Sequence, residues 1–368
     1  MKVVYIAPME LPVPCEKGAI EEIIWQLSRR LKNFVNVYIY NPTTSNNVYK
    51  LVKGLKPLAY QCDDCIIHSH NLYASLSISL LCKRLKHILT LHYPPTPPTV
   101  TKSKRRGKIL RKILQFLDAT GTVITAPSLY IKESLKHMGI KKAIFIPNGV
   151  DTSMFNPAKY SEELRERLLE GKDILIVNVG RIHPEKNQLA LLVAFNELVN
   201  RYGYRNVKLV LIGPTSGTFR VNKESPYYRL LVEYIRKHDL KSYVTFTELP
   251  RRSDVAKVLA SSDIYVHPSK VEAAAPLAVL EAMACRLPIV AFNLQYYRYY
   301  LINNFNSLLI PPNVRALTKS LLTLIEEGQL ASKLAENAYN SAIKYFSWNS
   351  VTKFYIKTYD VLVNYGEE

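Results

Sequence analysis

Short apolar runs alternate with stretches of helical periodicity along the whole chain. The runs are continuous rather than interleaved with polar residues, which is typical of parallel strands covered by helices on both faces. In the first half they predict strands over residues 3–8, 35–40, 65–70, 88–93, 122–127 and 143–148. Helices are expected between them, around 20–32, 73–85, 104–117 and 128–138.

A second series of the same kind follows the charged segment 160–172. Its apolar runs predict strands over residues 173–180, 207–213, 243–248, 263–269, 288–292 and 307–311. The intervening helices are expected at about 186–202, 225–238, 252–260 and 276–285. The chain closes with helical pattern from about 313 to 365, interrupted near Ser347, which fits the N-cap of a helix starting at Trp348.

Two such series predict an α/β protein with two Rossmann-like lobes, each built on a doubly wound parallel sheet. A length of 368 residues fits two domains of roughly 150 residues each. We place the lobes at 1–165 and 166–345, with a closing helix over 346–368. Because ligands bind beyond the carboxyl ends of the strands in such sheets, residues that follow strands are the candidates for function.

The charge and the cysteines narrow the choice of partners and compartment. A formal net charge of +19 predicts a surface that attracts nucleic acid, an anionic membrane face or phosphorylated substrates. The five cysteines are odd in number and scattered, unlike a secreted disulfide scaffold, so we expect a reducing cytoplasm. The first apolar run is too short for a signal peptide, and none reaches the roughly 18 residues of a membrane span. Any membrane contact is therefore expected at the surface, on the inner face of the cell membrane.

Sequence signatures of several enzyme classes are absent. The chain has no GxGxxG after the first strand and no GxxxxGK[ST], HExxH or GxSxG, which weakens dehydrogenase, kinase, zinc-protease and serine-hydrolase interpretations. Cys62, Cys65, His68 and His70 lie close together in sequence. Strand alternation, however, puts both histidines on one face and Cys65 on the other, which favours packing and a crevice-facing histidine over a zinc site.

Charged residues that follow strands in the second half form the main candidate site. Gly180 and Arg181 come directly after a strand, and Lys186 stands at the expected start of a helix. A guanidinium and an ammonium beside a helix N-terminus suit a diphosphate, although an exposed pair on a solvated turn fits the same spacing. Glu272 lies in a loop after a strand, and Glu281 lies inside the next helix, where its carboxylate suits ribose hydroxyls or simply faces solvent.

Together these segments resemble the retaining family-four glycosyltransferases, which have two Rossmann-like lobes facing a central cleft, the GT-B fold. The resemblance rests on NVGRIHPEKN and HPSKVEAAAPLAVLEAMACRLPIVA and extends over nearly the whole chain. Upstream, PVPCEKGAIEEIIWQL is similar to the family's glycine loop and first helix, CIIHSH to its HxH strand end, and TLHYP to its acceptor-side loop. IPNGVDTSMF and FSWNSVTKFYIKTYDVL resemble the segment between the lobes and the closing helices.

The resemblance implies roles for particular residues. Arg181 and Lys186 match the pair that binds the donor diphosphate, with Gly180 beside them, and Glu281 matches the carboxylate on the ribose. Glu272 matches the glutamate near the donor sugar. His92 matches the active-site histidine beside the anomeric carbon, and Gly18 with Ala19 the loop that approaches the phosphate or acceptor.

Several departures from the family pattern affect these assignments. Ala273-Ala274-Ala275 stand where the family has Gly-Phe-Gly, and Gly18-Ala19 where it has a double glycine. The family spaces its two glutamates by seven residues, whereas Ala273 through Leu280 make eight, so either a bulge restores Glu272 or Ala273 takes its place. Asn187 stands where the family has a glycine after the lysine.

The expected reaction is metal-independent transfer of a hexose with retention, from a UDP- or GDP-linked sugar. Two cations can neutralise the departing diphosphate, and no Asp-x-Asp pair is present to hold a metal, so no cofactor is expected. Retention requires a covalent nucleophile or same-face attack, and the resemblance favours the second. The acceptor is expected to be a lipid-linked saccharide, a glycan or another hydroxyl compound.

A basic segment follows the loop that carries His92. It combines an apolar stripe with basic residues and no acid, so it predicts an amphipathic helix that either lies on an anionic membrane or packs on the core with a solvated basic face. The tentative membrane or acceptor residues are Lys104, Arg105, Arg106, Lys108, Arg111 and Lys112.

Two other functions remain open from sequence. A nucleotide-sugar epimerase on the same two-lobe fold would use the same donor without an acceptor. A basic nucleic-acid-binding protein would explain the net charge but not the arrangement of Arg181, Lys186 and Glu281, and nucleic acid is therefore not expected as a partner. The oligomeric state is not predicted.

Overall fold

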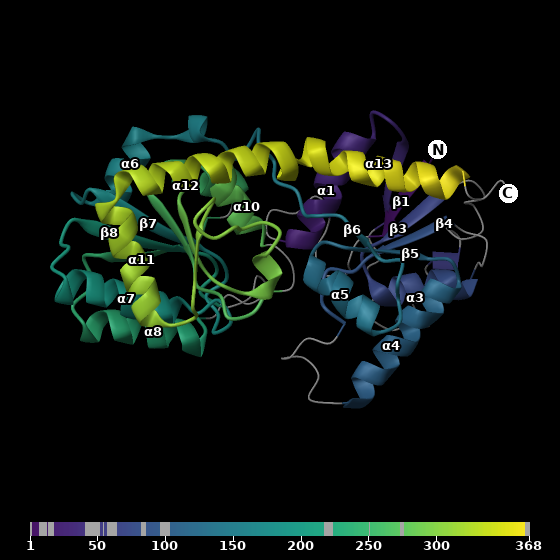
Figure 1. Cartoon of the computed structure of the whole chain (residues 1–368), viewed down its shortest axis with the longest axis horizontal. Helices are drawn as coiled ribbons and strands as arrows, with labels where there is room; N and C mark the ends of the chain where they lie inside the picture. The colour runs from purple at the N-terminus through teal and green to yellow at the C-terminus, as the bar shows by residue number, and fades with distance from the viewer. Residues whose placement is uncertain are drawn as a thin grey trace. The chain divides into compact units, whose positions relative to one another are not determined.

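The chain forms two compact units in the computed structural model, each with its own parallel sheet (Figure 1). The described residues are 2–6, 13, 18–40, 52–53, 55–56, 65–81, 86–95, 104–216, 224–249, 251–272 and 276–364, with 104–106 described by their backbone alone. Unit 1 runs to Gly149 and includes the last segment from Trp348. Unit 2 runs from Val150 to Glu272 and from Pro276 to Ser347.

Unit 1 is built on a sheet of six strands in which neighbouring strands are parallel. The strands are β1 (Lys2–Ile6), β2 (Asn36–Tyr40), β3 (Cys65–Ser69), β4 (Lys86–Thr90), β5 (Val123–Ala126) and β6 (Ile144–Phe145). Their order is β2-β1-β3-β4-β5-β6. The strand order reverses between β1 and β3, which is where a doubly wound sheet opens its ligand crevice.

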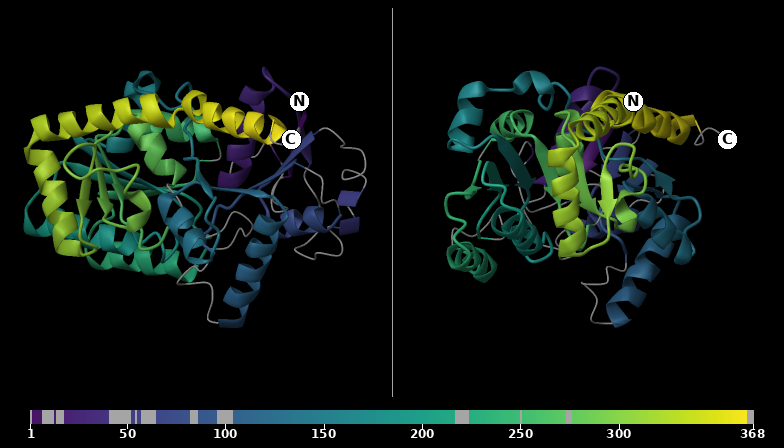
Figure 2. Two further views of the ribbon diagram at one scale, coloured as in Figure 1. Left: turned by 45° about the vertical axis from the view of Figure 1, so that its right-hand side comes forward. Right: turned by 60° about the vertical axis from the view of Figure 1, so that its left-hand side comes forward.

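Helices complete unit 1 by burying one stripe each. They are α1 (Ala19–Leu31), α3 (Leu72–Leu81), α4 (Lys104–Ala119), α5 (Leu129–His137) and α13 (Trp348–Asn364). Helix α1 buries Ile23, Ile24, Leu27 and Leu31, which fall on one helical face, and it contacts α13. The N-terminal end of α4 extends away from the sheet (Figure 2).

Unit 2 repeats the same layout with a second sheet of six parallel strands. The strands are β7 (Ile174–Val179), β8 (Val207–Ile212), β9 (Val244–Thr247), β10 (Ile264–His267), β11 (Ile289–Phe292) and β12 (Leu308–Ile310). Their order is β12-β11-β10-β7-β8-β9. Here the order reverses between β7 and β10, so the crevice is expected at the carboxyl ends of these two strands.

The helices of unit 2 form two groups. They are α6 (Glu162–Leu169), α7 (Gln188–Asn196), α8 (Pro226–Lys237), α9 (Arg252–Ala260), α10 (Leu277–Ala284), α11 (Val314–Glu326) and α12 (Gly328–Ser341). Helix α7 contacts α8 and α11, whereas α10 contacts α9 and α12 (Figure 1). Alternate residues of β8, Val207, Leu209 and Leu211, face the core cluster that also contains Phe195 of α7.

The prediction of two Rossmann-like α/β lobes is confirmed, and each of the twelve predicted strands is present. The ends of the strands differ from the prediction by up to three residues: β4 ends at Thr90 rather than at 93, and β6 ends at Phe145 rather than at 148. Helix α6 was not expected, because its eight residues are mostly charged and bury only Leu169. It forms with the help of an N-cap, in which Ser161 Oγ accepts a hydrogen bond from Leu164 N at 3.3 Å.

The cysteines differ from expectation at one position. Cys65 is disulfide-bonded, whereas Cys285 is a buried free thiol. The prediction of reduced cysteines is therefore wrong for Cys65, because spacing along the chain does not show which thiols the fold brings together.

Among the described helices, none combines the length and the apolar character that crossing a membrane requires.

Candidate active site

The loop after β7 carries Gly180, Arg181 and Lys186 to the point where the strand order of unit 2 reverses. Gly180 N donates to Ile212 O at 2.8 Å, which ties the start of the loop to β8. Gly213 lies against the same loop, with φ of +152°, and a Cβ at this residue would meet Gly180 O at 2.0 Å. Glycine at 213 is thus required by the close approach of the loops that leave β7 and β8.

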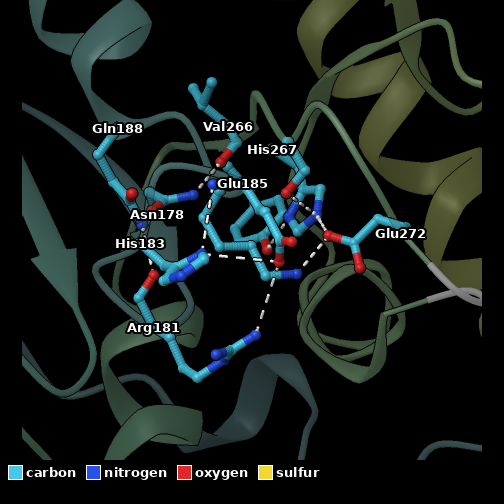
Figure 3. Close-up of polar contacts among 11 residues, drawn as sticks. Asn178, Arg181, His183, Glu185, Gln188, Val266, His267 and Glu272 are labelled. Carbon is cyan, nitrogen blue, oxygen red and sulfur yellow. Dashed lines mark hydrogen bonds and ion pairs between the residues drawn. The ribbon is translucent and has the colours of Figure 1, made fainter. Parts of the chain in front are cut away.

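The turn into α7 fixes the backbone around the two cations. Asn187 adopts a left-handed conformation with φ of 57°, and its amide donates to Pro268 O at 3.1 Å. Asparagine tolerates this conformation better than most residues, which explains how it stands where the family has glycine. Gln188 Nε2 donates to Arg181 O at 2.9 Å (Figure 3), so the first residue of α7 also holds the arginine backbone.

The loop after β10 meets this turn through a buried ion pair. Lys186 Nζ contacts Glu272 Oε1, and the two side chains are only 17% and 8% exposed. Lys270 N also donates to Glu185 O at 2.8 Å, so backbone and side chains join the same two loops. The structure therefore brings Lys186 and Glu272 together, and it is Glu272 whose carboxylate reaches the lysine.

Glu272 is ionised despite its burial. Burial by itself raises the pKa of this carboxyl, but the charge of Lys186 and a hydrogen bond from His267 outweigh burial and lower the pKa to about 2. His267 Nε2 lies 2.9 Å from Glu272 Oε1, as Figure 3 shows. Burial lowers the pKa of His267 itself, so this imidazole is neutral near pH 7.

Arg181 is more open than Lys186. Its side chain is 38% exposed, and its Nη2 lies 4.0 Å from Glu185 Oε2 (Figure 3). His183 sits beside the same carboxylate at 3.6 Å, and its pKa is lowered by partial burial and by the charges of Arg181 and Lys186. The exposed guanidinium of Arg181, next to the less exposed ammonium of Lys186, can meet an anion that enters from solvent.

Glu281 occupies a separate position in unit 2. Its buried carboxylate, on α10, pairs with the guanidinium of Arg252 at the start of α9. The same guanidinium lies over the ring of Phe155, 5.3 Å from its centroid. The two glutamates thus bind different cations, and the alternative of a solvent-facing Glu281 does not hold, because only 6% of its side chain is exposed.

His92 belongs to a cluster of buried histidines in unit 1. It lies just past β4, and its Nε2 is 2.8 Å from His70 Nδ1, which follows β3. The rings of His70 and His68 stack at 4.5 Å, so both histidines face the same side of β3, as strand alternation predicts. His68 bonds Tyr359 of α13 at 2.8 Å and Thr90 at 2.7 Å.

The remaining predicted residues are spread over unit 1. Gly18 caps α1, where its carbonyl accepts from Glu22 N at 3.0 Å, and Ala19 is the exposed first residue of that helix. Lys108, Arg111 and Lys112 are exposed on α4, and Arg111 Nη2 donates to His137 O at 2.8 Å. The side chains of residues 104–106 lie outside the described part of the structure.

Sequence reasoning missed several residues that support the site. His267 appeared only as part of a predicted strand, and Gln188 and Arg252 only as parts of predicted helices. Tyr297 is fully buried, and its ring meets that of His267 edge-on at 6.0 Å. A histidine at a strand end shortly before a glutamate was the one signal available.

In the described ranges, no three His, Cys, Asp or Glu side chains gather as a metal site.

Family models match almost the whole chain. Glycosyltransferase Family 4 matches residues 3–154, and Glycosyl transferases group 1 matches residues 160–341. The chain belongs to the family-four glycosyltransferases. Its two Rossmann-like lobes are those of the GT-B fold, which it shares with solved structures over nearly its full length.

Individual relatives of this glycosyltransferase support the assignment. An Escherichia coli UDP-Gal:alpha-D-GlcNAc-diphosphoundecaprenol alpha-1,3-galactosyltransferase is 24% identical over 310 residues, which cover 82% of this chain and 74% of the relative. Sucrose-phosphate synthase from Thermosynechococcus elongatus superposes with a TM-score of 0.81 at 18% identity, over 98% of each chain. Anabaena HepE in complex with UDP-glucose gives 0.76 at 18% identity, over 98% of this chain and 100% of the other.

The histidine cluster of the glycosyltransferase predicts sensitivity to acid. Burial lowers the pKa of His87 and His92 to about 3 and that of His68 and His70 well below the ordinary 6.5, so all four are neutral in the folded chain. Below pH 6.5 the unfolded chain binds protons that the folded chain does not. The free energy of unfolding should therefore decrease as the pH decreases, with a slope that approaches about 1.4 kcal/mol per pH unit for each histidine below pH 6.5.

Denaturant unfolding between about pH 7 and pH 5 measures this slope. His87→Leu removes one buried histidine, whose Nδ1 lies near Ser79 and Thr122 rather than His92, and should reduce the slope by up to about 1.4 kcal/mol per pH unit. A wild-type stability that is flat over this range, or a His87→Leu slope equal to that of the wild type, would contradict the assignment.

Proposed function

We propose that the protein is a retaining hexosyltransferase that takes a hexose from a nucleotide sugar, most simply a UDP-linked one. The observation that carries the proposal is the turn between β7 and α7, where Arg181 and Lys186 stand at the strand reversal of unit 2 with a carboxylate beside them. A guanidinium, an ammonium and the start of a helix together suit a diphosphate. The structural relative Anabaena HepE is solved with UDP and with UDP-glucose.

The proposed step breaks the bond between the anomeric carbon and the diphosphate oxygen. The acceptor oxygen bonds to the same face of the sugar, and the acceptor proton passes to the departing phosphate. Negative charge grows on the diphosphate as this bond breaks, so Arg181 and Lys186 stabilise the transition state more than the bound donor. Because these two cations supply the charge, we propose that the reaction needs no metal ion.

Three other residues complete the proposed site. Glu272 is placed near the donor sugar, because its ionised carboxylate can accept hydrogen bonds from sugar hydroxyls. Glu281 is proposed to bind the ribose, with its carboxylate held in place by the guanidinium of Arg252. His92 is proposed to act beside the anomeric carbon; it lies beyond the carboxyl end of β4, where a sheet of this kind binds ligands.

For the acceptor we propose a lipid-linked saccharide, with other glycan hydroxyls as the broader class. The Escherichia coli relative is named for transfer to a GlcNAc-diphosphoundecaprenol. The basic side chains exposed on α4 suit an acceptor that carries phosphate or lies at an anionic surface. A cytoplasmic enzyme working at the inner face of the membrane would meet both substrates.

Donor use is tested with purified protein in EDTA, by following nucleotide release from UDP-, GDP- and ADP-sugars with and without acceptor lipid. We expect release from one nucleotide class, dependent on acceptor, and a loss of about 10²–10³ in kcat/KM for Arg181→Ala, because one transition-state cation is removed. Arg236→Ala, which removes an exposed cation from α8, serves as the matched control and should have no effect.

Acceptor-independent conversion of the sugar would instead identify an epimerase. Activity that EDTA abolishes and a divalent ion restores would overturn metal independence. Equal activity of Arg181→Ala and Arg236→Ala would show that the turn after β7 does not bind the donor.

The membrane proposal rests on what α4 leaves exposed. Leu114 and Leu117 are buried in the core of unit 1, so the apolar face predicted for membrane contact is largely used for packing. Ile109 and Phe116 nevertheless stay 51% and 37% exposed on the helix that also exposes Lys108 and Lys112. We propose that this mixed basic and apolar surface contacts anionic lipid headgroups.

Co-sedimentation with vesicles that contain anionic phospholipid tests the contact. Lys108→Glu with Lys112→Glu should weaken binding by roughly 30-fold or more, since each basic residue near the surface contributes about 1 kcal/mol. The control is Lys237→Glu with Lys241→Glu, which makes the same charge change on exposed residues of unit 2. Equal loss in both double variants would show a nonspecific effect of net charge and contradict the role of α4.

A further inference from the structure

We propose that His267 is a positioning residue of the donor site, whose Nε2–H holds one oxygen of Glu272 and leaves the other oxygen to accept a hydroxyl of the donor sugar. The inference rests on the proposed function of Glu272 and adds the residue that orients it. Sequence reasoning assigned no role to His267.

The contacts around His267 form an unbroken buried chain. Tyr265 OH lies 3.0 Å from His267 Nδ1, and His267 Nε2 lies 2.9 Å from Glu272 Oε1, which Lys186 Nζ also contacts. Ser269 Oγ stands 3.0 Å from the same Nε2. Tyr265 is fully buried and His267 is 1% exposed, so the chain is shielded from water.

The chemistry of the two ends fixes where each proton lies. An ionised carboxylate only accepts hydrogen bonds, so His267 must present Nε2–H to Glu272. The imidazole is neutral, so its other nitrogen, Nδ1, carries a lone pair. Tyr265 must then donate its hydroxyl proton to Nδ1. The tautomer of His267 with its proton on Nε2 is therefore the one that makes every hydrogen bond in this chain, and the hydroxyl of Tyr265 stabilises it.

The two carboxylate oxygens of Glu272 have different surroundings. Oε1 accepts hydrogen bonds from both Lys186 Nζ and His267 Nε2. No hydrogen bond to Oε2 comes from the described residues, and an ionised carboxylate oxygen can accept hydrogen bonds. A sugar hydroxyl is a donor of the right kind for this atom. His267 therefore determines which edge of the carboxylate faces the substrate.

The loop itself explains why such support is needed. Glu272 is followed by three alanines where the resembling family has Gly-Phe-Gly, and by a spacing to Glu281 that is one residue longer. Side-chain contacts with Lys186 and His267 place Glu272 regardless of that spacing. The edge-on ring of Tyr297, 6.0 Å away, closes the remaining side of the imidazole.

Kinetics of three variants test the inference. His267→Leu should lower kcat/KM for the nucleotide sugar by about 10- to 100-fold, the usual effect of losing a hydrogen bond to a charged group. His267→Gln should restore activity to within a few-fold, because its amide N–H can take the place of Nε2–H. Tyr265→Phe should show an intermediate loss, since it removes only the group that fixes the tautomer.

Two further readouts separate positioning from a merely structural role. In His267→Leu the pKa of Glu272 rises, so the acid limb of the kcat/KM profile should move to higher pH, whereas in His267→Gln it should not move. Nitrogen-15 NMR of histidine-labelled protein, assigned with His267→Gln, should show the Nε2–H tautomer, and Tyr265→Phe should allow Nδ1–H to appear.

The outcomes also distinguish this inference from the proposed function. An Nδ1–H tautomer in the wild type, or full activity of His267→Leu, overturns the role of His267 while leaving donor use intact. If no nucleotide sugar is turned over, the proposed function fails, yet the tautomer still decides whether His267 donates to Glu272.

Discussion

The ion pair between Lys186 and Glu272 is the interaction on which the candidate site depends. It joins the loops that leave β7 and β10, the two strands between which the order of the second sheet reverses. Burying two charges costs several kcal/mol each before their attraction is counted, and such pairs are weak evidence of stabilisation. The position of this pair, where a doubly wound sheet binds its ligands, is better explained by chemistry, because strongly perturbed groups gather at functional sites.

Both units bury polar groups around the candidate residues. Unit 2 buries charge, in the Lys186–Glu272 and Arg252–Glu281 pairs, where each cation meets a carboxylate. Unit 1 buries neutral imidazoles, and His68 is held there by Tyr359 and Thr90. Tyr359 comes from α13, so the last helix of the chain takes part in the polar core of the first unit. Charged groups suit binding of a diphosphate, and a neutral histidine suits contact with uncharged sugar or hydroxyl groups.

The fold could be predicted from sequence in most respects, because twelve continuous apolar runs mark strands covered on both faces. Arg181 and Lys186 were found for a related reason: they follow a strand and precede a helix, a place that sheet topology makes functional. Helix α6 was missed because it buries almost nothing and depends on its cap. His267 was missed because its role comes from hydrogen bonds with Glu272 and Tyr265, and the spacing of these residues along the chain does not predict those bonds. The eight-residue spacing left Glu272 and Ala273 as alternatives, and the contact with Lys186 favours Glu272.

The central claim is that the turn between β7 and α7 binds the donor diphosphate. A crystal structure of the protein grown with UDP tests it most directly. The account predicts that oxygens of the β-phosphate lie at about 2.7–3.2 Å from the guanidinium of Arg181 and from Lys186 Nζ, with the ribose at Glu281. UDP bound with its phosphates away from this turn, while Lys186 contacts Glu272 alone, would contradict it.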